Sequence, residues 1–241
     1  MKPTLRCSLL LGLGLLVIGK GTLVAQTTAA GSPTTSLTVT IQVQNNAQVD
    51  SKTLAEAEKV ATKIFSNVGV EICWVDVRVT SEYRPGNPVD QGSVNFSHIW
   101  LTIAPHLLAE LNLPSGVMGF APGMRPNRKL IYVLYDRVET IYQRQTMVRI
   151  EGSTYASATR SQILGHAIAH ELGHVLLNIE SHSKTGIMRG RWNLKDLQDV
   201  SCGRLLFTSQ QAEVIRTDVF RRVTDSKTPQ IARLESPKLD H

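Results

Sequence analysis

The chain has 241 residues, of which 42% are hydrophobic and 19% charged, so it is long enough for one domain with a sizeable core, and its composition excludes collagen, a coiled coil and disorder. The 26 Lys and Arg residues exceed the 20 acids and give a net charge of +6. Three of the basic residues, Lys2, Arg6 and Lys20, lie in the first 26 residues, which hold no acid. The chain from residue 27 onward therefore carries a net charge of +3. This mild charge, without a dense basic stripe, excludes nucleic acid as an expected partner.

The first 26 residues have the pattern of a secretory signal peptide. A basic start is followed by an apolar run over residues 8–18 and by small residues around Ala25 or Ala29. The apolar run is shorter than the ~20 residues that span a bilayer, so we expect cleavage, with an uncleaved anchor as the alternative. The chain has no second hydrophobic span. The pattern predicts a secreted or periplasmic protein without a stable membrane span after cleavage.

The rest of the chain divides into three parts by composition. Residues 27–36 are small and polar and form a linker, residues 37–226 form the folded domain, and residues 227–241 form a flexible polar tail. No internal repeat is present.

Hydrophobic periodicity predicts the elements in the first half of the domain. Residues 37–43 alternate apolar and polar side chains, as a strand does. Residues 51–68 place apolar side chains at helical spacing, and Gly69 supplies a stop. Residues 82–93 are rich in Pro and Gly and predict a loop. Three further apolar segments predict strands: 70–79, 99–103 and 129–135.

Capping pairs predict the helices of the second half. Each pair is an Asp or Thr followed three residues later by Glu or Gln: Asp136 with Glu139, Thr159 with Gln162, and Thr208 with Gln211. The first helix is expected to end near Met147, and the last is amphipathic. One sheet with a few helices in this order predicts an α+β fold.

Two cysteines, Cys73 and Cys202, remain after signal cleavage. In an oxidising compartment they could form a disulfide that ties the sheet to the C-terminal segment, or they could be two unrelated buried thiols. Sequence does not report their separation, so both alternatives stay open.

The helix predicted after Thr159 carries the pentad His-Glu-Leu-Gly-His at residues 170–174. Residues four apart on a helix point to nearly the same side, so His170 and His174 can reach one metal ion. The helix is apolar around nearly its whole circumference, so these polar groups are expected to be buried, which is costly without a partner. A zinc ion removes that cost, and Glu171 is placed to contact a metal-bound water. The pentad therefore predicts zinc-dependent peptide hydrolysis.

Gly173, in the middle of this helix, costs about 1 kcal/mol relative to Ala. A packing reason is expected, such as another segment that passes close to the helix at this position.

Catalytic zinc usually takes three protein ligands, and the third must follow a chain reversal. Asn178 tolerates the left-handed conformation that ends a helix. Glu180 and His182 are the candidates after it, and we favour His182 because imidazole is the commoner third ligand. His166 lies one turn before the pentad and is better interpreted as a surface or packed histidine than as a ligand, because three successive helical histidines diverge from one tetrahedral centre. His98 and His106 lie outside any motif and receive no role.

The stretch from His170 to Met188 resembles the metzincin clan of zinc metalloproteases, whose motif is HExxHxxGxxH or HExxHxxGxxD followed by a methionine turn beneath the metal. It is also similar to uncharacterised secreted bacterial proteins with HELGH, a His-Ser pair and Gly-Ile-Met-Arg. The resemblance implies a zincin-like fold, with a mixed twisted sheet, an active-site helix and a smaller C-terminal subdomain. It implies that His170 and His174 are ligands, that Glu171 is catalytic, and that residues 186–188 form the methionine turn.

The chain departs from the clan at two positions. Leu177 stands where the clan has Gly, and Glu180 stands where the clan has its third ligand. A helix that ends one residue later, at Asn178, would shift the ligand role to His182.

Together the ligands and the resemblance imply a mechanism with one catalytic zinc ion and a peptide or protein substrate. Zinc lowers the pKa of its bound water and polarises the scissile carbonyl, while Glu171 takes the water proton and returns it to the departing amine. Residues 116–123 resemble the clan's edge region, along which an extended peptide pairs, or they form a plain surface loop. Three residues after the turn could border the pocket for the residue after the cleaved bond: Arg189, Arg191 and Trp192.

Two other functions stay open beside the secreted zinc metalloendopeptidase. One is a catalytically idle, zinc-stabilised binding protein, against which Glu171 argues, because a structural zinc site does not need that residue. The other is a small-molecule amide hydrolase on the same fold, which a substrate profile would separate from a peptidase.

Overall fold

The computed structural model describes residues 5–6, 36–77, 98–106, 113–114, 116–122, 129–147 and 157–227. The predicted loop at 82–93, most of the linker and the tail beyond residue 227 lie outside the described residues. Of the predicted signal peptide, only β1 (Leu5–Arg6) is described. No helix in the described part combines the length and the apolar character needed to cross a bilayer.

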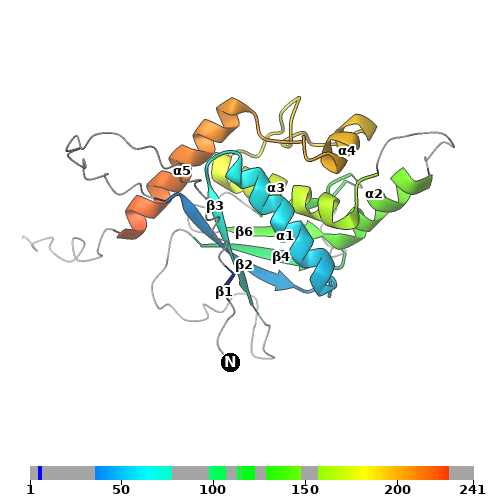
Figure 1. Cartoon of the computed structure of the whole chain (residues 1–241), viewed down its shortest axis with the longest axis horizontal. Coiled ribbons are helices and arrows are strands. Elements are labelled where there is room, and N and C mark those ends of the chain that lie inside the picture. The colour runs from blue at the N-terminus through cyan, green and yellow to red at the C-terminus, as the bar shows by residue number, and fades with distance from the viewer. Residues whose placement is uncertain are drawn as a thin grey trace, which may run out of the picture.

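A six-stranded mixed sheet runs in the order β1-β3-β2-β4-β6-β5 (Figure 1). Its four inner strands are parallel, and the short outer strands β1 and β5 are antiparallel to their neighbours. The inner strands are β2 (Thr38–Asn45), β3 (Glu71–Asp76), β4 (His98–Ala104) and β6 (Leu130–Leu134). Strand β5 (Gly119–Phe120) lies at the end of this strand order and pairs only with β6 among the described residues.

The predicted mixed sheet with helices is observed, as a mixed α/β fold. Alternate residues of the inner strands are fully buried, as in Val39, Ile41 and Val43 of β2, because one face of the sheet forms the core. Figure 1 shows α1 (Ser51–Ser66) and α3 (Arg160–Leu177) lying together over the sheet. Their backbones approach so closely that a Cβ at Gly165 of α3 would stand 2.6 Å from the Ala57 carbonyl oxygen of α1.

The capping pairs are confirmed at two of their three positions. Thr159 and Gln162 cap α3 reciprocally, and Thr208 and Gln211 do the same ahead of α5 (Ser209–Lys227). The third pair is wrong, because α2 (Tyr135–Met147) begins directly after β6 and places Asp136 inside its first turn. Glu139 instead binds the Arg160 guanidinium, with an Oε1–Nη2 distance of 2.8 Å, and so ties α2 to α3. Residue 135 consequently belongs to the helix and not to the predicted strand.

No disulfide joins Cys73 and Cys202. The Cys73 side chain is buried in β3, whereas Cys202 is exposed at the end of α4 (Leu194–Ser201). The interpretation as two unrelated residues holds in part, since only one of the two is buried.

Candidate metal centre and active site

Helix α3 carries the pentad between two well-defined ends. The capping box at Thr159 begins the helix, and Asn178 ends it in the left-handed conformation, with φ 53° and ψ 46°, as predicted. Nearly all side chains between these ends are buried, because the helix packs against α1, α2, α4, α5 and the sheet. His170, Glu171 and His174 are buried with them, at 7%, 4% and 8% exposure.

Backbone carbonyls orient the two helical histidines. The Nδ1 atom of His170 lies 2.7 Å from the Ile187 carbonyl oxygen, and Nδ1 of His174 lies 2.9 Å from the Ile179 carbonyl oxygen. A carbonyl oxygen can only accept a hydrogen bond, so each Nδ1 must carry a proton and donate it. In the neutral ring this leaves Nε2 with its lone pair, which is the form that binds a metal.

The two Nε2 atoms face each other at 3.1 Å. Desolvation by burial lowers the pKa of His170 to about 4 and lowers that of His174 as well, so both rings are neutral near neutral pH. No hydrogen then lies between these two lone pairs, and their repulsion is relieved by a cation that both can bind.

His182 completes a group of three. One ligand atom from each of His170, His174 and His182 can be chosen so that all lie within 4.8 Å of one another. The His182 ring packs closely against the backbone, since a Cβ at Gly190 would stand 2.9 Å from its Cγ. Glu180 lines the neighbouring cleft but is not a member of this group.

The turn at residues 186–188 lies directly against α3. Gly186 has φ +73°, and a Cβ there would stand 2.8 Å from the Leu206 carbonyl oxygen, so this position needs glycine. Ile187 supplies the carbonyl that holds His170. Met188 is fully buried, and its Sδ would lie 2.5 Å from a Cβ at Gly173. The packing reason expected for Gly173 is therefore confirmed, with Met188 and Phe207 as the close neighbours.

Glu171 is a buried carboxyl without a visible counter-charge. Its Oε2 has no hydrogen-bond partner among the described residues, and desolvation raises its pKa to about 8. It faces the edge strand β5, because a Cβ at Gly119 would stand 2.7 Å from Glu171 Cγ and 2.8 Å from Cδ. A buried acid with a strongly shifted pKa beside three histidines is typical of a catalytic site.

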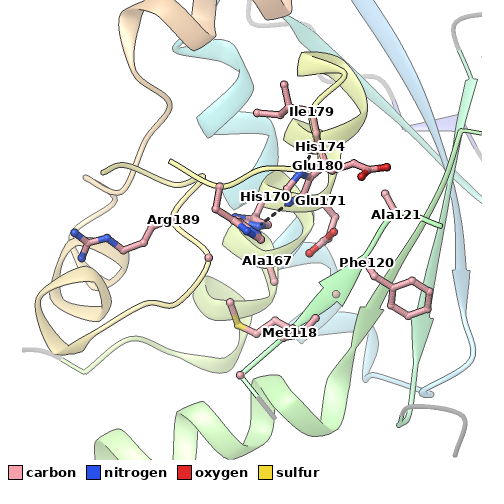
Figure 2. Close-up of a pocket in the computed structure, with 15 residues that line it drawn as sticks. Met118, Phe120, Ala121, Ala167, His170, Glu171, His174, Ile179, Glu180 and Arg189 are labelled. Atoms are coloured by element: carbon pink, nitrogen blue, oxygen red, sulfur yellow. Dashed lines mark hydrogen bonds between the residues drawn. The ribbon is translucent and has the colours of Figure 1, made fainter. Parts of the chain in front are cut away.

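A cleft of about 290 Å³ lies over these groups. Residues 116–121 form one side, α3 forms the floor with His170, Glu171 and His174, and the chain after α3 forms the other side (Figure 2). Residues 116–121 of the predicted edge region 116–123 thus lie at the site, with the short strand β5 among them.

The three residues proposed to border a pocket differ in position. Arg189 lines the cleft, but its guanidinium is occupied by the Asp196 carboxylate at 3.0 Å and by the Lys184 carbonyl oxygen. The Arg191 side chain lies beside Gly116, 3.5 Å from where a Cβ would be. Trp192 does not line the cleft; it lies behind His170 and donates from Nε1 to the Ile187 carbonyl oxygen at 3.4 Å.

The other histidines that the structure describes, His98, His106 and His166, are separate from the metal group. His166 is buried on α3 and its Nδ1 lies 2.8 Å from the Gln162 carbonyl oxygen, in agreement with the interpretation as a packed histidine. His98 on β4 contacts Gln42, and His106 is exposed. Sequence reasoning missed the close approach of Gly119 to Glu171 and the carbonyls of Ile179 and Ile187, because backbone groups leave no trace in a side-chain pattern.

Comparison with protein-family models and with curated proteins finds no match. Among solved structures, the chain is similar to a zinc-dependent peptidase from Methanocorpusculum labreanum (strain Z), at 14% sequence identity and a TM-score of 0.46. The similarity covers 73% of this chain and 99% of the other.

Proposed function

We propose that this protein is a zinc-dependent metalloendopeptidase of metzincin-like type. The proposal rests on one observation. On the buried helix α3, the neutral side chains of His170 and His174 face each other with their Nε2 lone pairs at 3.1 Å. His170, His174 and His182 are the proposed ligands, and Glu171 is the proposed catalytic residue.

The donor set fits zinc. Two nitrogens bound to a tetrahedral zinc at the usual Zn–N distance of ~2.0–2.1 Å lie about 3.3 Å apart, close to the separation of the two helical Nε2 atoms. Three imidazoles leave a fourth position for water or substrate, as in catalytic sites. His182 is favoured over Glu180 as the third ligand because only His182 belongs to the group of close ligand atoms.

When bound, zinc would supply Lewis acidity that activates water and polarises the scissile carbonyl. The positive charge beside Glu171 favours its carboxylate form and so opposes the effect of burial on its pKa. The Glu171 carboxylate then accepts a proton from the attacking water and donates it to the amine that leaves. Burial of this group excludes bulk water, so the proton stays available for that second transfer.

An extended peptide is the proposed substrate. Strand β5 pairs with β6 on one edge, and its backbone at Gly119 adjoins Glu171. A peptide that adds to the other edge of β5 by main-chain hydrogen bonds would bring a peptide bond to the histidines.

Secretion is part of the proposal and is supported by the signal-peptide pattern of residues 1–26. Cleavage after this segment would remove β1, which pairs only with β3 among the described residues, and would leave the rest of the sheet intact. N-terminal sequencing of protein recovered outside the cell tests this directly; a mature chain that retains Leu5 would refute cleavage.

Metal analysis of purified protein combined with a casein or peptide-library assay tests the function. We expect one zinc per chain and cleavage by the wild type. Glu171→Gln should retain zinc and lose cleavage, because it keeps the side-chain shape but removes the base. His182→Ala should lose zinc, whereas Glu180→Ala should retain it. Stoichiometric zinc without cleavage of any peptide would favour the idle binding protein, and cleavage confined to small amides would favour the amide hydrolase.

A further inference from the structure

Glu180 places a negative charge on the rim of the cleft, and the proposed hydrolysis does not use it. Its side chain is exposed and lines the cleft, yet it lies outside the group formed by His170, His174 and His182. Figure 2 shows its carboxylate directed away from the histidine rings and toward the side of the cleft formed by the β5 segment. This is the side on which a substrate peptide is proposed to lie.

The backbone that presents Glu180 is held by the last turn of α3. The Ile179 N–H donates to the His174 carbonyl oxygen at 3.3 Å, and the Ile179 carbonyl accepts from His174 Nδ1 at 2.9 Å. Asn178 fixes the chain direction just before, in its left-handed conformation. The same contacts that orient a proposed metal ligand therefore fix the point on the rim from which the Glu180 carboxylate projects.

Glu180 is also the charged side chain at the open rim of the described cleft lining whose charge no described protein group compensates. The other charged residues of the described lining are Glu171, which is buried, and Arg189, whose charge is compensated by Asp196 at 3.0 Å. Within the described part of the chain, no hydrogen bond or ion pair occupies the Glu180 carboxylate. An uncompensated carboxylate at the mouth of a cleft attracts cations.

We infer that Glu180 is a specificity-determining residue that selects peptide substrates with a Lys or Arg side chain close to the cleaved bond. The inference rests on the proposed peptidase function. A peptide extended along β5 projects alternate side chains to one side, so a basic side chain at one position can reach the rim while the backbone stays paired. Because the pair is exposed to solvent, it is weak, and the preference it produces is about fivefold.

The test uses pairs of N-acetylated peptides. Within a pair, one position near the cleaved bond holds either Lys or its uncharged analogue norleucine, and one pair is made for each position that flanks the bond. Acetylation removes the α-amine as a competing cation. For the wild type we expect the ratio of kcat/KM for Lys over norleucine to reach about five at one position and to fall at 1 M salt. Glu180→Gln should bring that ratio to about one, and Glu180→Lys should bring it below one, because the new cation repels the Lys side chain.

Glu213→Gln is the matched control, because it removes one negative charge from the exposed surface of α5, away from the cleft. It should keep the wild-type ratio. Equal ratios in wild type and Glu180→Gln, with cleavage intact, would overturn the inference and leave the peptidase function standing. Loss of zinc in Glu180→Gln would also overturn it, since Glu180 would then be a ligand. Failure of the zinc-loaded wild type to cleave any peptide would refute the peptidase function and the inference with it.

Discussion

Replacing Gly119 with Ala should disable catalysis without removing the metal. The added Cβ would lie 2.7 Å from Glu171 Cγ and 2.8 Å from Cδ, and it would also meet the Tyr132 carbonyl oxygen. Carbon atoms pack at ~3.5–4.0 Å, so Glu171 or the strand must move by about 0.8 Å. A misplacement of about 1 Å at a catalytic group can cost ~100-fold in rate. Overpacking of this kind also destabilises by about 1–3 kcal/mol.

The assay is kcat/KM on a cleaved peptide, with zinc content and urea unfolding measured on the same preparation. Gly116→Ala is the control within the same segment, because its Cβ would meet only the flexible Arg191 side chain, at 3.5 Å. We expect the Gly119 variant to keep its zinc and lose about two orders of magnitude in kcat/KM, whereas the Gly116 variant retains far more activity. Wild-type kcat/KM in Gly119→Ala would refute the close approach of β5 to Glu171.

Three further outcomes are expected. Gly173→Ala should destabilise the fold by about 1–3 kcal/mol in urea unfolding, because the clash with Met188 and Phe207 outweighs the better helix propensity of Ala; a more stable variant would contradict the packing described here. Asn178→Ala should cost about 1–2 kcal/mol at φ 53°, and Asn178→Gly should restore most of it, as unfolding curves of the pair would show. In metal-free protein the pKa of Glu171 is raised from 4.5 to about 8, so its contribution to stability is present below pH 4.5 and is lost as the pH rises toward 8. The free energy of unfolding of Glu171→Gln and of the wild type is to be measured in a chelator at pH 5 and at pH 8. The variant should be more stable relative to the wild type at pH 8 than at pH 5. A difference that does not change with pH would show that the carboxyl is not desolvated.

The parts of the site that depend on local chemistry could be predicted from sequence. The Thr159 capping box, the Asn178 stop and the buried circumference of α3 are all properties of neighbouring residues, and the structure contains each of them. The capping pair predicted at Asp136 and Glu139 failed because it lies at the boundary between two elements. Helix α2 starts where β6 ends, so Asp136 has no room to act as a cap ahead of it.

Contacts between distant segments could not be derived in this way. The approach of Gly119 to Glu171 depends on the strand order, which places β5 at the edge beside α3. Likewise the exposure of Cys202 depends on how the end of α4 faces solvent. Periodicity predicts that an element exists and which face is apolar, but not which neighbour covers it.

Main-chain oxygens hold the two helical histidines of the site. The residues that supply these oxygens therefore contribute to the site whatever side chain they carry. Changing the Ile187 or Ile179 side chain leaves the carbonyl that receives each Nδ1 proton in place. Substitutions at these two positions should thus keep the hydrogen bonds to His170 and His174, provided that the path of the chain is kept. The positions that fix this path are Gly186 and Asn178, both with positive φ. Variation between relatives should accordingly fall on Ile179 and Ile187 and spare Asn178 and Gly186.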